Sequence, residues 1–255
     1  MKLIDTHSHL YVNEFALDRE QALERAEKQG VIKILLPAID SREHGALLDL
    51  EAAHPGICLA MMGLHPCSVR ENYREELDIV EGHLEKRRFI AIGEMGLDFY
   101  WDKTFVAEQY LAFQRQAAWA RELGIPLVIH SRESMDACIG EVRKMQDGRL
   151  RGVFHCFTGT TEQAAQITGL GFHLGIGGVV TFKKSGLDQV LDQVPLEHLV
   201  LETDAPYLAP VPMRGKRNES AYLGYIVQKL ADIKEMPVAE VAEATTQNAQ
   251  KLFAC

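Results

Sequence analysis

The sequence predicts a (β/α)8 barrel, the TIM-barrel form of the α/β class. Short runs of apolar and β-branched residues alternate with longer stretches of helical periodicity, and eight such runs occur along the 255 residues. Strict alternation implies parallel strands joined by right-handed crossovers. Such barrels fill about 250 residues as one domain, whereas the alternative, an open doubly wound sheet, more often has about five to seven strands. We therefore expect residues 1–255 to form one barrel domain.

The expected elements follow in order along the chain. The strands are bounded by turn residues and cover residues 3–7, 32–38, 57–64, 88–94, 125–130, 152–156, 172–176 and 198–202. The helices between them have apolar residues near i, i+3, i+4 spacing and cover residues 15–29, 42–53, 73–86, 104–123, 133–145, 161–168 and 187–194. Two further helices follow the last strand, at residues 219–233 and 238–253. Long polar loops at 93–103 and 203–218 would lie at the C-terminal ends of strands, where active sites of this fold are built.

Composition and charge exclude several classes of protein. With 47% hydrophobic and 25% charged residues, the chain is neither disordered nor a membrane protein. The 27 Lys and Arg against 36 Asp and Glu leave a net charge of −9, which argues against a broad basic face for nucleic acid. No apolar run approaches the roughly 20 residues that span a bilayer. The five scattered cysteines form no CxxC pair, so we expect reduced thiols and a cytoplasmic protein.

Imidazole and carboxylate groups recur at one end of the expected strands. Residues i and i+2 of a strand point to the same side, so His7 and His9 can direct two imidazoles at one point, as a borderline divalent cation requires. An isolated pair would be weak evidence, because a lone histidine more often makes a structural hydrogen bond. Matching groups at other strand ends make metal binding the favoured interpretation. The candidate ligands are His7, His9, Glu94, His130, His155 and Asp204.

This set exceeds what one ion needs, since catalytic zinc usually takes three protein ligands. We therefore expect two divalent cations, of Zn, Mn, Mg, Ni or Co, with Glu94 central enough to bridge them. Two metals about 3.5–4 Å apart can stabilise both the attacking and the leaving oxygen of a displacement at phosphorus. Asp204 would orient the attacking water and take its proton, which makes Asp204 and Glu94 the expected catalytic residues. His65 and Arg132 would bind phosphate.

Other groups expected on this face have two interpretations. Tyr100, Trp101 and Tyr207 either stack on nucleobases or pack their loops, and packing is slightly favoured. The basic cluster at 214–217 is equally consistent with a phosphate site and with a solvated loop.

Six motifs, taken in order, resemble the TatD family of metal-dependent hydrolases. They are DTHSHL at 5–10, GLHP at 63–66, GEMGLDF at 93–99, HSR at 130–132, HCFTG at 155–159 and LETDAPYLAP at 201–210. The resemblance covers nearly the whole chain and implies an amidohydrolase-type TIM barrel that acts as a divalent-metal deoxyribonuclease or phosphodiesterase, with a 3′ to 5′ exonuclease preference. It further implies one metal on His7, His9 and Asp204, a second on His130 and His155, Glu94 as the bridge, and phosphate contacts from His65 and Arg132.

The chain departs from the family pattern at three positions. Cys67 stands where a second histidine is common, Thr158 where serine is common, and Ser220 where a proline is common. None of these is an expected ligand.

We expect the substrate to be a DNA end or a short single strand, as in DNA catabolism, with no membrane and no obligate protein partner. Two divalent cations would place four positive charges on the face where phosphate arrives, so the local field outweighs the net charge. The alternative is a metal-dependent amidohydrolase or other esterase acting on a small-molecule C–N or C–O bond. Related barrels of that kind often bridge their metals with a carboxylated lysine, whereas this chain has Glu94. A third alternative, a catalytically inactive binding scaffold, is disfavoured by the complete ligand set.

Overall fold

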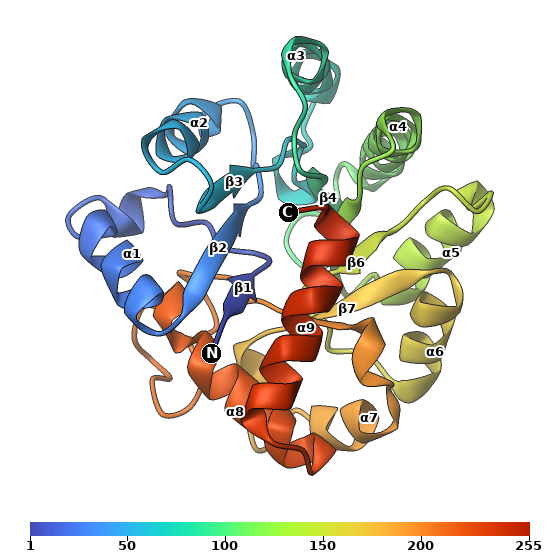
Figure 1. Cartoon of the computed structure of the whole chain (residues 1–255). Coiled ribbons are helices and arrows are strands. Elements are labelled where there is room, and N and C mark those ends of the chain that lie inside the picture. The colour runs from blue at the N-terminus through green and yellow to red at the C-terminus, as the bar shows by residue number, and fades with distance from the viewer.

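The computed structural model describes residues 1–255 and shows a parallel β-barrel inside a ring of helices (Figure 1). The predicted barrel is confirmed. Its strands are β1 (Leu3–Asp5), β2 (Val31–Leu36), β3 (Cys58–Ala60), β4 (Ile92–Asp98), β5 (Leu127–Arg132), β6 (Gly152–Phe154), β7 (Phe172–Ile176) and β8 (Leu199–Leu201). The helices are α1 (Arg19–Lys28), α2 (His44–Ala53), α3 (Tyr73–Lys86), α4 (Val106–Leu123), α5 (Met135–Met145), α6 (Thr161–Gly169), α7 (Leu187–Gln193), α8 (Leu223–Lys234) and α9 (Val238–Phe253).

The strands close into a ring through two short junctions. Hydrogen bonds join β1, β2 and β3 in one group and β4 to β8 in another, each in chain order and all parallel. A parallel bridge from Met62 to Ile92 connects the groups at one edge, and a bridge from Ser8 to Ala205 connects them at the other. Every strand therefore has a neighbour on both sides, and the sheet has no free edge.

An apolar layer fills one end of the barrel. Its members lie in strands on opposite sides of the ring, or directly beside those strands. They nevertheless contact one another in one cluster, so their side chains point into the barrel. They are Ile4, Leu35, Met61, Ala91, Val128, Val153 and Val200. Helix α9 lies across this end of the barrel in Figure 1 and adds Ala249, Leu252 and Phe253 to the same cluster. The barrel is thus closed at this end.

The fourth strand lies further along the chain than predicted. The sequence suggested that it covers 88–94 and that a loop begins at Gly93, because a charged residue after an apolar run normally ends a buried strand. The structure instead has β4 from Ile92 to Asp98, with every residue buried and Asp98 paired in register with Arg132. The prediction was wrong because the Glu94 side chain meets charge partners from other strands, described below, which the local sequence does not reveal.

Two helices begin four residues later than predicted. Helix α1 begins at Arg19 and not at residue 15, because Phe15 is buried in a separate 3-10 turn. Helix α8 begins at Leu223 after a 3-10 turn at Ser220–Tyr222, whereas α9 covers the predicted residues 238–253. No helix of the structure is both long enough and apolar enough to cross a membrane.

Candidate metal centre

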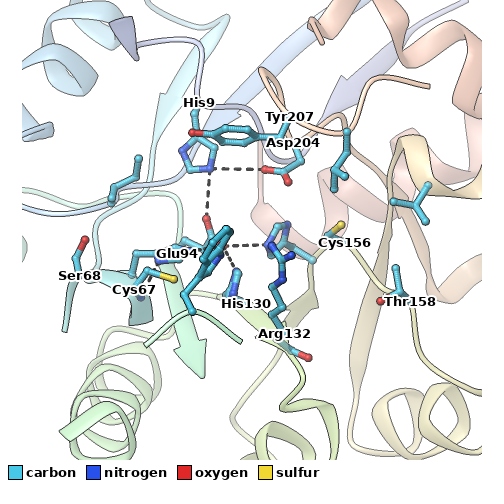
Figure 2. A pocket seen from close by; sticks show the side chains of 17 residues that line it. His9, Cys67, Ser68, Glu94, His130, Arg132, Cys156, Thr158, Asp204 and Tyr207 are labelled. Carbon is cyan, nitrogen blue, oxygen red and sulfur yellow. Dashed lines mark hydrogen bonds and ion pairs between the residues drawn. The ribbon is translucent and has the colours of Figure 1, made fainter. Parts of the chain in front are cut away.

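A cavity of about 770 Å³ opens at the C-terminal ends of the strands (Figure 2). It lies at the opposite end of the barrel from the apolar layer. All the predicted site residues except the fully buried His7 line it directly, and they are His9, His65, Glu94, His130, Arg132, His155 and Asp204. The structure therefore brings together residues that are up to about two hundred positions apart in the sequence.

The carboxylate of Glu94 lies at the centre of this group. Its Oε2 atom is 3.1 Å from Nε2 of His7 and 3.3 Å from Nε2 of His9. Its Oε1 atom is 2.8 Å from Nδ1 of His130, and it lies 2.9 and 3.2 Å from the Nε2 atoms of His155 and His65. Each oxygen of one carboxylate thus faces a different set of imidazoles, which is the arrangement a bridging ligand requires.

The local structure of β4 directs Glu94 into the cavity. The register of β4 against β5 shifts between Ile92 and Met95, so Glu94 lies at an irregularity in the ladder. Such an irregularity re-aims a side chain that regular alternation would direct elsewhere. Gly93 makes this possible, because a Cβ atom there would lie 2.7 Å from the Cβ of Val128.

Asp204 approaches the same group from the segment after β8. Its Oδ1 atom is 3.7 Å from Nε2 of both His7 and His9. The backbone holds it there: Asp204 N donates to the carbonyl of His7 at 2.8 Å, and Asp5 accepts hydrogen bonds from the backbone and hydroxyl of Thr203. Burial raises the pKa of Asp204 to about 6, against partial compensation from His155 and His9.

Charge in the centre is balanced between Glu94 and its imidazoles. Burial alone would raise the pKa of Glu94, but His65, His155 and His7 outweigh it, and the pKa lies well below its usual value. Burial likewise opposes protonation of His155, His65 and His130, yet Glu94 and other partners raise the pKa of all three. Burial lowers the pKa of His7. The central carboxylate is therefore ionised and needs positive charge around it.

Hydrogen bonds behind the imidazoles set their orientation. The Tyr11 hydroxyl donates to the carbonyl of Pro37 at 2.7 Å, so its oxygen accepts from Nδ1 of His9 at 3.0 Å. That leaves the Nε2 lone pair of His9 directed into the centre, as metal ligation requires. His155 has Glu202 at 3.4 Å behind its Nδ1 atom.

Asp98, which is not among the predicted site residues, has the same relation to His130. Its Oδ2 atom is 2.9 Å from Nε2 of His130, and its Oδ1 atom accepts from the backbone N–H groups of Tyr100 and Trp101. Burial would raise the pKa of Asp98, but the His130 and backbone hydrogen bonds lower it. The available signal was a second carboxylate four residues after Glu94, which was hidden because the strand was expected to have ended.

The donor atoms fit divalent cations. Three sets of side chains each place one nitrogen or oxygen atom within 4.8 Å of the others: His7 with His155 and Asp204, His7 with His9 and Glu94, and His65 with Glu94 and His130. The Nε2 atoms of His7 and His9 lie 3.3 Å apart and face the same carboxylate oxygen. His65, expected to bind phosphate, is as close to Glu94 as the expected ligands are.

Among the cations, Arg132 alone lines the cavity. Its guanidinium lies 4.0 Å from the ring centre of Tyr100 and 5.2 Å from that of Trp101. The basic cluster at 214–217 does not reach it: Arg217 is paired with Asp18 at 2.6 Å, and Arg214 lies over the ring of Phe182. Of the two interpretations of this cluster, the structure favours a loop over a phosphate site in the cavity.

Comparisons with known proteins agree with this geometry. The family model described as TatD related DNase matches residues 4–254. An uncharacterized metal-dependent hydrolase of Bacillus subtilis, YabD, is 35% identical over 252 residues, 98% of each chain. A protein of Pantoea ananatis named 3′-5′ ssDNA/RNA exonuclease TatD is 34% identical over 257 residues, covering 98% of this chain and 99% of its own. The crystal structure of YjjV, a TatD homologue of Escherichia coli, superposes with a TM-score of 0.93 at 30% identity, covering 99% of this chain and 98% of its own.

Proposed function

The chain belongs to the TatD-related DNase family of metal-dependent hydrolases, and from that premise we propose that it is an exonuclease that shortens single-stranded DNA from the 3′ end. The observation that carries this proposal is the position of Glu94, whose two oxygens face separate sets of imidazoles at the floor of a cavity with one unpaired arginine. The relative from Pantoea ananatis, which is named as a 3′-5′ ssDNA/RNA exonuclease, supports the polarity and the single-stranded substrate.

Two divalent cations would be held by this chain. His7, His9 and Asp204 would hold one, His130 and His155 the other, and Glu94, which lies beside both sets, would contact both. When bound, such cations stabilise negative charge on a phosphoryl group and lower the pKa of water. The imidazole-rich donor set suits Zn, Mn, Ni or Co better than Mg by ligand softness.

The protein's own groups would then bind the substrate and move one proton. Arg132 and His65 would hold non-bridging phosphate oxygens, and Arg132 suits this because a guanidinium stays charged and binds two oxygens at once. Asp204 would accept the proton of the attacking water.

The test uses metal-stripped protein and 5′-labelled single-stranded DNA, with Mg²⁺, Mn²⁺ or Zn²⁺ added back. We expect metal-dependent shortening from the 3′ end, about two bound ions per chain by elemental analysis, and at least about a hundredfold loss of rate in Asp204→Asn. Glu240→Gln, the same change of carboxylate to amide on an exposed position of α9, is the control and should cleave normally. Absence of shortening with every metal, or full activity of Asp204→Asn, would overturn the proposal; hydrolysis of small carboxylic esters or amides alone would support the amidohydrolase alternative.

A further inference from the structure

Two aromatic side chains at the rim of the cavity are exposed to solvent. Trp101 is 67% exposed and lines the cavity, and its neighbour Tyr100 is 47% exposed. Side chains that merely pack a loop would be covered by it, because burying an aromatic ring is a large source of stability. The packing interpretation favoured by the sequence therefore does not describe Trp101.

The two rings are arranged around Arg132. The guanidinium lies over Tyr100 at 4.0 Å and closer to that ring than to Trp101, while the two rings meet edge to face at 84°. The guanidinium forms no ion pair, so its N–H groups are free for a phosphate. Tyr100 has one face covered by Arg132, whereas most of the Trp101 indole has no protein neighbour.

One carboxylate fixes this rim to the centre. Asp98 accepts hydrogen bonds from the backbone N–H groups of Tyr100 and Trp101 at 2.9 and 3.0 Å, and its other oxygen is 2.9 Å from His130. Asp98 is itself held by Gln109, whose side chain exchanges two hydrogen bonds with the Asp98 backbone. The Trp101 backbone is thus positioned relative to an imidazole that faces Glu94.

We propose that Trp101 stacks on an unpaired nucleobase beside the phosphate that Arg132 binds, and that this rim selects single-stranded ends. The proposal rests on the proposed function and deepens it by assigning the base contact. A base has a free face for stacking only when it is not enclosed between neighbours in a duplex, and aromatic stacking tolerates any base. Tyr100 acts through Arg132, by holding the guanidinium in place.

The test compares an oligonucleotide of normal sequence with one that has an abasic site at the last or the next-to-last position. Stacking on Trp101 should lower KM about 5- to 150-fold, the range that base stacking on aromatic side chains supplies. We expect Trp101→Ala to raise KM for the normal strand by this factor and to leave kcat within about twofold of wild type. Trp101→Phe should recover most of the loss in affinity. Tyr225→Ala removes an aromatic ring that is exposed on α8, away from the cavity, and should change neither constant. In wild type one abasic site should raise KM by a similar factor, and in Trp101→Ala it should have no further effect.

Fluorescence supplies a second measurement that needs no turnover. The chain has two tryptophans, and Trp119 is buried on α4, so it gives a constant background. Titrating metal-loaded Asp204→Asn with the normal strand should quench the fluorescence of Trp101, and a strand that is abasic at both the last and the next-to-last position should not. The inference alone would be overturned if the wild type cleaved normal and abasic strands with equal KM. It would also be overturned if the increases in KM caused by the abasic site and by Trp101→Ala multiplied. A wild type that shortens no single strand would overturn the proposed function and the inference with it.

Discussion

The two ends of the barrel differ sharply although the same strands build both. Val128 and Val153 are register partners in the apolar layer beneath α9. Two residues further along the chain, on the same inward side, lie His130 in β5 and His155 directly after β6. One step of strand periodicity thus separates a closed apolar layer from a charged cavity.

This difference teaches that stability and chemistry occupy separate layers of one barrel. The layer beneath α9 contributes by removing apolar surface from water. The layer above it concentrates five imidazoles around one ionised carboxylate, which costs free energy unless cations or protons compensate. Substitutions in the apolar layer should therefore affect mainly stability, and substitutions in the charged layer should affect mainly catalysis.

The largest expected effect is on catalysis, from Glu94→Gln. A neutral amide keeps one acceptor oxygen, so it cannot serve both sets of imidazoles. We expect kcat to fall by about a thousandfold, which corresponds to about 4 kcal/mol in the activation barrier. Bound metal should also fall below two ions per chain, while the circular dichroism spectrum stays unchanged. Normal turnover by a correctly folded Glu94→Gln would contradict the central role of this carboxylate.

The next largest effect is on stability, from Phe253→Ala in α9. Phe253 is 4% exposed and packs in the apolar layer, and truncating a buried phenylalanine costs about 3–5 kcal/mol. Denaturant unfolding should show this loss, whereas kcat per folded molecule at low temperature should remain within about twofold of wild type. A large loss of kcat with unchanged stability would show that the two layers are not separate.

A smaller effect is expected from Asp98→Asn, which acts on the cavity through His130. Loss of the charged partner behind a ligating imidazole typically lowers metal affinity or activity about 10- to 100-fold. Asp102→Asn, in the loop that follows β4, is the matched control, since Asp102 pairs with Arg70 and does not contact His130. We expect a raised metal concentration to restore much of the Asp98→Asn activity. Equal effects of the two substitutions would mean that Asp98 only supports the loop.

The sequence predicted the barrel well because its evidence is local. Most strands contain a short apolar run, and α9 shows its helical periodicity over all of 238–253. The position of β4 was not predictable in this way, because Glu94 continues a buried strand only when imidazoles at or just beyond the C-terminal ends of β1, β5 and β6 surround it. Strand-end patterning did single out the five histidines whose nitrogen atoms lie close to the Glu94 carboxylate. It missed Asp98, since hydrogen bonds behind an imidazole leave no periodic signal.

The apolar layer beneath α9 also determines how substrate and product enter and leave the site. A barrel closed at one end is a blind pocket, so nothing that enters can pass through. On the proposed function, each released nucleotide must leave by the mouth through which the next stretch of strand arrives. Product and substrate then compete for one entrance, so the released mononucleotide should act as a competitive inhibitor. Its inhibition constant would then limit the rate of successive cleavages.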